Sequence, residues 1–302
     1  MTINIVVLGS ANADYSMRTP RIPSAGETLQ GSDFQFALGG KGANQAIASA
    51  RLGGRVAFVA CVGRDSAGEL ALATYRDAGI DVDAVSVVDA PTGSALIFVD
   101  DAGENCIGVA AGANEHLAQS HAEAASRRIA NASHLLMQLE TPIATIQAAA
   151  EIARDCGTQT ILNPAPARPL PRELLALVDI VTPNQTELAS LTDMRVTSQT
   201  ETVEAARELQ SRGPNTVIVT LGAAGALVVT DDTVIPVETS QVAAIDTTAA
   251  GDTFNGALTV ALAQGETLID AVHFANRAAA LSVTRRGAID AIPTRVEVDA
   301  FR

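Results

Sequence analysis

The sequence has no tryptophan, and aromatic residues make up only 3% of its 302 residues. A buried core must therefore come from Ala, Val, Leu and Ile, which suits helices packed closely on a buried sheet. Apolar residues account for 47% of the chain, which excludes a disordered protein. The length is enough for one large α/β domain or two small ones.

Cysteine is scarce as well. The three cysteines, Cys61, Cys106 and Cys156, are an odd number with wide spacings, and no CxxC pair occurs. This pattern indicates neither a disulfide framework nor a zinc site. Three idle thiols are typical of a reducing compartment, so we expect a cytoplasmic protein.

Long apolar runs and an excess of basic residues are also absent. The apolar run at residues 1–8 is too short for a signal peptide and lacks a basic start, and no run of about 20 apolar residues could span a membrane. With 20 basic against 34 acidic residues, the net charge is −14, which repels nucleic acids and anionic membranes. We therefore expect no nucleic-acid partner and no membrane partner.

Short apolar runs recur along the chain and predict strands that are covered on both faces. They occupy residues 3–8, 56–60, 134–137, 160–162, 179–181 and 216–219. Segments with helical spacing lie at residues 43–52, 70–78, 143–154, 203–209, 251–263 and 268–283. The alternation predicts a three-layer α/β/α fold with a mostly parallel central sheet. Ligands of such folds bind at the carboxyl ends of the strands.

Two stretches break this alternation. Residues 11–36 read as turns and short strands, and residues 92–111 as a hairpin with an Asp/Gly-rich turn. Together they could form a small β-sheet lid that keeps water from a site, and ordinary surface hairpins are the alternative. No repeat or linker divides the chain, so we expect residues 1–302 to form a single domain that carries this lid.

The strongest motif is DTTAAGDTFNG at residues 246–256. Its small residues let the backbone approach a ligand, and a long apolar helix begins near Gly251. The N–H groups of the first helical turn lack internal partners and can hold a phosphate. Asp252 lies in that turn and could take the proton of a hydroxyl group as a general base. The alternative is a carboxylate that only complements the helix dipole.

A second motif, GGKGANQA at residues 39–46, is a glycine-rich turn before a helix. It fits neither GxxxxGK[ST] nor GxGxxG, because Gln45 stands where the last glycine would be, which argues against a Rossmann dinucleotide enzyme. Lys41 opposes the dipole of the helix that it begins, which indicates that an anion or polar ligand visits the turn. The alternative is a solvated lysine.

Polar residues after two predicted strands could bind hydroxyl groups. Asn12 and Asp14 follow the first strand, where α/β ligands gather, and an Asx turn is the alternative. Glu140 follows the strand at residues 134–137 and could be another hydroxyl ligand or a surface charge.

Two further groups could serve a nucleotide. Asn184 and Glu187 share one side of a helix start, and their oxygens suit Mg²⁺, often through waters. A helix cap is the alternative for this pair. The loop TLGAAG at residues 220–225 could line a nucleotide, and a bare glycine turn is its alternative.

In their order and spacing these motifs resemble the ribokinase family of sugar kinases, from the first strand almost to the end of the chain. Residues 39–44 look like the first signature of that family, and residues 246–256 look like the second. Residues 108–114, 137–140 and 163–167 look like the ribose-specific branch of the family rather than its other members.

The resemblance implies transfer of the γ-phosphate of ATP to the 5-hydroxyl of D-ribose, with Mg²⁺ as cofactor. By position Asp252 matches the catalytic base, and the backbone N–H groups of Ala249, Ala250 and Gly251 match an anion hole. The sugar-binding positions match Asn12, Asp14, Gly40, Lys41, Gly42, Asn44 and Glu140. The nucleotide positions match Asn184, Thr220, Gly222, Gly225, Gly251 and Asn276, and Glu187 matches the Mg²⁺ region.

Members of this family also use a monovalent cation, normally K⁺, beside the anion hole. At the matching positions Asp246 would supply a side-chain oxygen, and mainly backbone oxygens would come from Thr248, Ser282, Arg285 and Gly287. One position departs from the pattern, because Ala291 stands where a serine hydroxyl is often a ligand and a water would have to replace it. Relatives often pair through their lids, so the resemblance also implies a homodimer.

Two alternatives stay open. A kinase of the same family that acts on another sugar or on a nucleoside would share this mechanism, although the pair Asn12 and Asp14 and the full hairpin lid favour a small free pentose. A non-catalytic sugar sensor on a kinase fold would have lost its base or its anion hole, and both Asp252 and Gly251 are present.

Overall fold

The structure is a computed structural model that describes residues 4–301. The predicted strand at residues 3–8 begins outside the described residues, and its described part is β1 (Ile5–Leu8). Within residues 4–301 we find no helix that combines the length and the apolar character needed to cross a membrane.

Nine strands form the central sheet, in the order β13-β12-β11-β10-β9-β8-β1-β4-β5. Besides β1 they are β4 (Val56–Gly63), β5 (Val85–Val88), β8 (His134–Met137), β9 (Gln159–Leu162), β10 (Ile180–Val181), β11 (Thr216–Thr220), β12 (Ala226–Val229) and β13 (Val234–Val237). Neighbours from β11 to β5 pair in parallel, whereas β12 and β13 pair antiparallel at one edge. The prediction of a mostly parallel sheet is confirmed. The predicted runs omit β5, β12 and β13. The edge strands β5 and β13 are short and partly exposed, whereas β12 is buried and directly follows the glycine-containing loop at residues 220–225.

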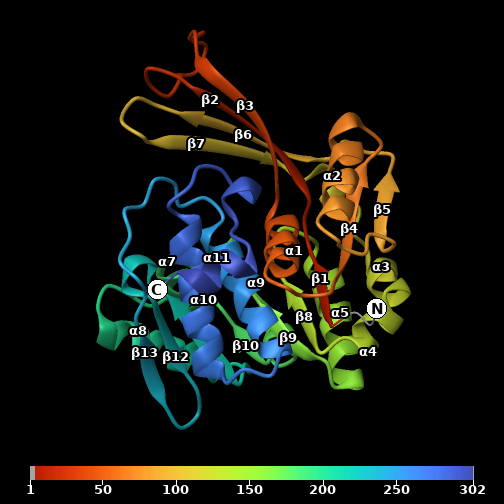
Figure 1. The fold of residues 1–302 in the computed structure, drawn as a ribbon, viewed down its shortest axis with the longest axis vertical. Helices are drawn as coiled ribbons and strands as arrows, with labels where there is room; N and C mark the ends of the chain where they lie inside the picture. Colours follow the sequence, from red (N-terminus) through yellow and green to blue (C-terminus); the bar gives the residue numbers. More distant parts are fainter. Residues whose placement is uncertain (1–3, 302) are drawn as a thin grey trace.

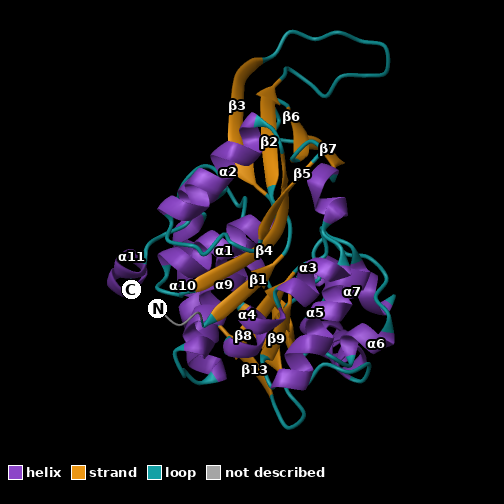
Figure 2. Cartoon of the chain, turned by 90° about the vertical axis from the view of Figure 1, so that its right-hand side faces the viewer, coloured by secondary structure: helices purple, strands orange, loops and turns teal. Residues whose placement is uncertain are grey.

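Helices cover both faces of this sheet (Figures 1 and 2). Those on one face are α1 (Lys41–Arg51), α2 (Ser66–Asp77), α9 (Ala250–Ala263), α10 (Leu268–Ser282) and α11 (Arg295–Ala300). Those on the other are α3 (Gln119–Ala124), α4 (Ser126–Asn131), α5 (Ile143–Cys156), α6 (Arg172–Leu175), α7 (Gln185–Thr192) and α8 (Gln199–Gln210).

The two helical layers explain why the central strands are apolar throughout. Successive side chains of a strand point to opposite faces of its sheet. Accordingly, Ile5 and Val7 pack in one hydrophobic core and Val6 and Leu8 pack in the other. Because both faces are buried, no position of β1 is left for a polar residue, and the three-layer prediction is confirmed.

A second sheet of four strands extends away from the central sheet (Figures 1 and 2). Its order is β3-β2-β6-β7, with β2 (Asn12–Arg18), β3 (Ser32–Gly39), β6 (Gly93–Val99) and β7 (Asn105–Ala110). The central pair β2 and β6 is parallel, and the other neighbours are antiparallel. β3 continues past residue 36 to Gly39, so this sheet leads directly into the glycine-rich turn. Its action as a lid stays a prediction.

Candidate active site

The candidate base lies at the start of α9, against α1. Asp252 is only 7% exposed, and both of its carboxylate oxygens accept hydrogen bonds from α1. Asn44 Nδ2 donates to Oδ2 of Asp252 at 2.9 Å, and Gln45 Nε2 donates to Oδ1 at 2.9 Å. Two donors from one helix hold the carboxylate in a single orientation, and each such bond to a charged group is a strong one.

The backbone N–H groups at the start of α9 are the second feature of the site. Ala249 precedes α9 with a φ of 58°, a backbone conformation that non-glycine residues rarely adopt and that is common at functional sites. Among residues 4–301 the N–H groups of Ala249 and Gly251 have no acceptor, whereas that of Ala250 donates to the carbonyl oxygen of Thr247 at 3.2 Å. The start of α9 can therefore bind an anion through Ala249 and Gly251.

Two polar residues of β2, Asn12 and Asp14, are predicted to bind the sugar, and Asp14 lies close enough to Asp252 to interact with its charge. Asn12 is buried and accepts a hydrogen bond from Asn114 Nδ2 at 2.7 Å. Burial, together with repulsion from Glu140 and Asp252, raises the pKa of Asp14 to about 6. Oδ1 of Asp14 and Oδ1 of Asn44 are buried without a partner among the described residues. Such acceptors lower their free energy when a ligand brings hydroxyl donors.

The start of α1 is built around glycines and one carboxylate. Oε2 of Glu140 accepts hydrogen bonds from Ser10 Oγ at 2.5 Å and from the backbone N–H of Lys41 at 2.9 Å, so Glu140 is not a free surface charge. Gly40 has a φ of 89°, and a Cβ there would lie 2.8 Å from the backbone nitrogen of Asn12. A Cβ at Gly42 would lie 2.4 Å from the nitrogen of Ser10. Only glycine lets α1 begin this close to the end of β1.

Lys41 belongs to a charged cluster and is not a solvated side chain. Burial lowers the pKa of Lys41, but the negative charges of Asp252, Glu140 and Glu187 outweigh it and raise the pKa. Burial also raises the pKa of Glu187, against a hydrogen bond from the backbone of Asn184 and the charge of Lys41. The cluster therefore offers one cation among several carboxyl groups.

Asn184 and Glu187 form a capping box at the start of α7. The backbone N–H of Asn184 donates to Glu187 Oε2 at 2.9 Å, and that of Glu187 donates to Asn184 Oδ1 at 2.8 Å. The helix-cap alternative therefore describes their geometry correctly. Both residues also line a cavity, so capping does not exclude a role toward a ligand.

Two cavities meet at Gly251. A polar cavity of about 200 Å³ is lined by Lys41, Asn184, Glu187 and Asp252, and a mainly apolar pocket of about 280 Å³ adjoins it. The residues that line both are Thr220, Thr247, Ala250 and Gly251. The joined space suits a ligand with a flat apolar end and an anionic end.

The residues predicted to bind a nucleotide fall in this joined space. Those in the apolar pocket are Thr220, Gly222, Gly225, Gly251 and Asn276, whereas Asn184 lines the polar cavity. Asn276 Nδ2 donates to the carbonyl oxygens of Val237 and Glu238 at 3.0 and 3.2 Å, so its amide fixes the end of β13. The sequence motifs do not predict one part of the apolar pocket, which is lined by Thr239, Ser240, Gln241, Val242 and Ala244. That segment has neither helical nor strand periodicity.

Three further polar residues line the polar cavity but are not among the predicted site residues: Asn163, Thr182 and Asn255. Thr182 Oγ1 donates to Asn255 Oδ1 at 2.6 Å, and Asn255 Nδ2 donates to the carbonyl oxygen of Gly251 at 2.8 Å. Asn163 and Asn255 lie inside motifs that the sequence singles out, at residues 163–167 and 246–256. A polar residue directly after a buried strand, as at Asn163 and Thr182, is the signal that could have identified them.

The predicted K⁺ ligands lie in two loops that touch. Oδ1 of Asp246 accepts hydrogen bonds from the N–H and hydroxyl of Thr248 at 2.9 and 2.6 Å, and Oδ2 accepts one from the N–H of Gly287. Ser282 and Arg285 share the turn after α10, where the N–H of Arg285 donates to the carbonyl oxygen of Ser282 at 3.1 Å. The structure thus brings the predicted positions together.

Two features limit the ligands that these loops can offer. The side chain of Arg285 turns away to form an ion pair with Glu297 at 2.6 Å, so only its backbone can face the loop. Ala291 lies nearby in a short 3₁₀ turn, Ile289–Ala291, and is 1% exposed. Its methyl group offers no oxygen.

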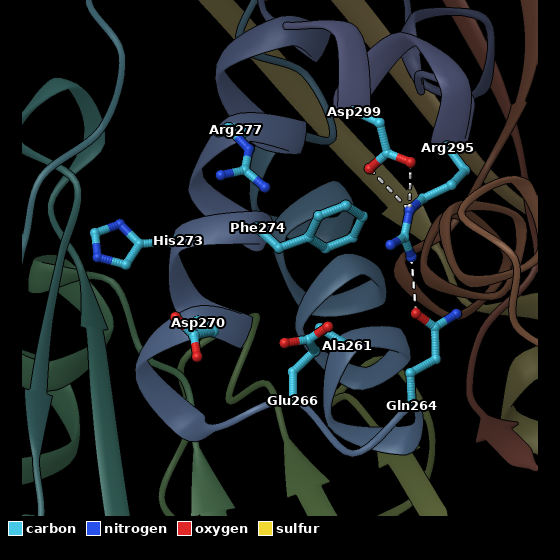
Figure 3. A pocket seen from close by; sticks show the side chains of 9 residues that line it. All are labelled: Ala261, Gln264, Glu266, Asp270, His273, Phe274, Arg277, Arg295 and Asp299. Atoms are coloured by element: carbon cyan, nitrogen blue, oxygen red, sulfur yellow. Dashed lines mark hydrogen bonds and ion pairs between the residues drawn. The ribbon is translucent and has the colours of Figure 1, made fainter. Parts of the chain in front are cut away.

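A further cavity of about 330 Å³ lies between α9, α10 and α11 (Figure 3). None of the predicted site residues lines it. Three of its polar side chains pair with one another, because Arg295 donates to Asp299 at 3.0 Å and to Gln264 at 2.8 Å. The predicted site residues therefore favour the two joined cavities as the candidate active site.

Comparisons with known proteins identify the family of the chain. A family model described as pfkB family carbohydrate kinase matches residues 2–295. Ribokinase of Haemophilus influenzae is 45% identical over 302 residues, covering 100% of this chain and 99% of that protein, and ribokinase of Staphylococcus aureus is 41% identical, covering 99% of each. The structure of Arabidopsis thaliana ribokinase complexed with ribose and ATP matches with a TM-score of 0.94 at 34% identity, covering 99% of this chain and 98% of that one. Because these matches extend over nearly the full length, the chain belongs to the pfkB family of carbohydrate kinases.

Proposed function

We propose that the protein transfers the γ-phosphate of ATP to the 5-hydroxyl of D-ribose and releases ADP and D-ribose 5-phosphate. The observation that carries this proposal is the setting of Asp252, a buried carboxylate that is oriented by two amide donors and lines the polar cavity. It directly follows Gly251, which lines both cavities. Proteins similar over their full length are ribokinases, and one was solved with ribose and ATP, which supports this pair of substrates.

Asp252 is the proposed general base. With ribose bound beside it, the carboxylate accepts the proton of O5 as that oxygen attacks the γ-phosphorus in line, and ADP departs. The N–H groups of Ala249 and Gly251 donate to the negative charge of the phosphoryl group in transit. Ala250 contributes less than the sequence predicts, because its N–H already has an acceptor.

The polar cavity is the proposed place of the ATP phosphates. Lys41 lies there as a cation that attracts them, and the apolar pocket takes the base. Mg²⁺, when bound, neutralises phosphate charge. Among residues 4–301 no three His, Cys, Asp or Glu side chains gather as a metal site, so we expect the phosphates and waters to hold most of its coordination. Glu187, which lines this cavity, is the acidic residue proposed to lie near Mg²⁺.

We propose that Asp14 and Asn44 recognise the sugar, because each keeps a buried oxygen acceptor open. Asn12, Gly40, Lys41, Gly42 and Glu140 complete the proposed sugar site. Asp14 alternates with Tyr15 along β2, so its side chain lies on the face of the small sheet opposite to that of Tyr15. That sheet would close over bound ribose as a lid and keep water from the γ-phosphate.

The loops around Asp246 and Gly287 are the proposed K⁺ site. Their oxygens are of the hard type that alkali cations prefer, and the carboxylate of Asp246 supplies the negative charge. Burial raises the pKa of Asp246, but hydrogen bonds from Thr248 and Gly287 outweigh this and hold the pKa below its usual value. The carboxylate is therefore ionised at neutral pH. A cation here would act by shaping the loop that presents Ala249.

We further propose a homodimer formed through the small sheet. Tyr15 pairs in register with Phe36 on β3 and with Leu96 on β6, so the three side chains share one face. Phe34, Phe36 and Leu96 are 67%, 41% and 57% exposed, and the ring of Phe34 stacks on Tyr15. Exposed apolar patches of this kind mark interaction surfaces. Analytical ultracentrifugation tests the dimer, and Phe34→Ser should weaken it.

A cytoplasmic location is proposed as well. Cys61, Cys106 and Cys156 are free, as expected in a reducing compartment that also supplies ATP. Cell fractionation with an antibody against the protein tests this location.

The direct test of the function is ADP release from MgATP, with and without K⁺, in the presence of D-ribose, 2-deoxyribose, fructose or adenosine. We expect strong turnover on ribose. Turnover on another acceptor alone would keep the mechanism and overturn the substrate. No turnover on any acceptor would contradict the proposed kinase activity and favour a sugar-binding protein.

A further inference from the structure

A chain of buried amide side chains leads to the carboxylate of Asp252. Gln45 of α1 is fully buried and donates through Nε2 to Asp252 Oδ1 at 2.9 Å and to Asn163 Oδ1 at 3.0 Å. Its Oε1 accepts a hydrogen bond from Gln138 Nε2 at 2.6 Å. Asn163 follows β9 and Gln138 follows β8, so residues at the ends of two strands bind the amide of Gln45.

The neighbours of Gln45 allow only one orientation of its amide. Asn163 Nδ2 donates to the carbonyl oxygen of Thr182 at 3.2 Å, which turns Asn163 Oδ1 toward Gln45. If the amide of Gln45 were reversed, its oxygen would face the acceptors on Asn163 and Asp252, and its nitrogen would face the donor of Gln138. Buried polar groups left without partners are strongly unfavourable. Both donors of Gln45 therefore point toward Asn163 and Asp252.

We propose that Gln45 is a positioning residue for phosphoryl transfer, oriented by Gln138 and Asn163, and that it keeps Asp252 in place and in the ionised form that accepts a proton. Hydrogen bonds donated to the charged form of a carboxyl group favour that form. Gln45 does not line the polar cavity, so it acts through Asp252. The role proposed for Gln45 in phosphoryl transfer rests on the proposed function.

The electrostatic surroundings explain why Asp252 needs such donors. The charged groups whose fields reach it are Asp14 of β2, Lys41 of α1 and Glu187 of α7. Two of these three groups are acidic and disfavour another negative charge, and α9 itself carries no further charged side chain. Asn44 and Gln45 donate hydrogen bonds to the carboxylate without adding charge.

The test uses Gln45→Met, which keeps the length of the side chain and removes the amide. We expect kcat on ribose to fall about tenfold to a hundredfold, because a hydrogen bond to a charged group is lost. KM for ribose should change little. The acidic limb of the kcat/KM profile should move about one unit to higher pH.

Two further variants separate positioning from packing. Gln138→Met removes the donor that orients Gln45 and does not contact Asp252, so it should move the acidic limb in the same direction by a smaller amount. Gln147→Met on α5 changes a glutamine that bonds Glu151 at the surface, and it should leave the rate and the profile unchanged. Reduced thermal stability of Gln45→Met with an unmoved acidic limb would overturn the proposal.

A second measurement does not depend on turnover. The ¹³C NMR signal of the Asp252 carboxyl carbon, assigned with Asp252→Asn, should titrate at higher pH in Gln45→Met and Gln138→Met than in the unmodified protein. Equal titration in all three proteins would also overturn the proposal. If the unmodified protein fails to phosphorylate ribose, the proposed function is wrong, and the NMR titration still decides the role of Gln45. If Gln45→Met does not fold, Gln138→Met decides it.

Discussion

Asp246 and Gly287 are 41 residues apart in the chain, and the backbone N–H of Gly287 donates to Oδ2 of Asp246 at 2.9 Å. The bond ties the loop before α9 to the turn after α10. Ala249, whose N–H is part of the proposed anion hole, follows Asp246 closely in the first of these loops. The two loops therefore form one unit whose shape sets the start of α9.

A cation bound to this unit should activate the enzyme. We expect ADP release to rise with KCl when choline chloride keeps the ionic strength constant. Ala291→Ser places a hydroxyl oxygen where the buried methyl group offers none, so the K⁺ concentration for half-maximal activation should fall about threefold to tenfold. The absence of a K⁺ response in both proteins would contradict the proposed site.

Replacing the proposed base should abolish most turnover and spare binding. Asp252→Asn keeps the size of the side chain but cannot accept the proton of O5, so kcat should fall about 10²- to 10⁴-fold. Ribose binding, measured by calorimetry, should weaken much less.

A matched control for this variant exists on α10. Asp270 also lies in the first turn of its helix, where the hydroxyl of Thr267 donates to it at 2.6 Å. Asp270→Asn removes a carboxylate that complements a helix dipole and should cost only about 1 kcal/mol of stability, with turnover retained. Equal loss of activity in both variants would show that Asp252 only stabilises the start of α9.

Asp14 should lower the stability of the unliganded protein at neutral pH and contribute to sugar binding. Its pKa is raised to about 6 from 3.8, so its stabilising contribution is present below about pH 4 and is lost as the pH rises through 6. At pH 8 the free energy of unfolding of Asp14→Asn should therefore exceed that of the unmodified protein by about 2 kcal/mol. The difference should shrink as the pH falls from 7 to 4.

The same variant should bind ribose poorly. Loss of one carboxylate acceptor should raise KM for ribose about tenfold at pH 8. Denaturant unfolding at several pH values and steady-state kinetics measure the two effects. A less stable Asp14→Asn protein at pH 8 would show that the carboxylate is paired in the folded protein.

Phe274 should contribute to stability without contributing to catalysis. The guanidinium of Arg295 lies 4.6 Å from the centre of its ring, and that of Arg277 lies at 5.9 Å (Figure 3). Phe274→Leu should lower the free energy of unfolding by about 1–2 kcal/mol and leave kcat unchanged.

Double-mutant cycles test which arginine matters more. Because attraction between a cation and a ring falls with distance, the coupling of Phe274 to Arg295 should exceed its coupling to Arg277. Urea unfolding of Phe274→Leu, of Arg295→Ala and Arg277→Ala, and of the two double variants that combine Phe274→Leu with one arginine change measures both couplings. Equal values, or a changed kcat, would contradict this account.

Local patterns were sufficient to predict most of the architecture. A strand buried on both faces needs an unbroken apolar run, so β1, β4, β8 and β11 lie where those runs occur. The short and partly exposed edge strands β5 and β13 carry no such requirement and leave no such signal. Likewise, the run of small residues before Asp252 predicts a helix start that is open to an anion, and α9 begins there.

The sequence by itself determined which segments are buried and where ligands could approach the backbone, because burial and close approach require particular residue types at each position. Only the tertiary structure decided which polar groups meet. Gln45 and Asp252 are 207 residues apart and come within 2.9 Å because α1 packs tightly on α9, where a Cβ on Gly256 would lie 2.6 Å from the Cβ of Ala48. Periodicity describes how each helix is buried but not which neighbour it packs against. That choice is made by the close packing of the whole core.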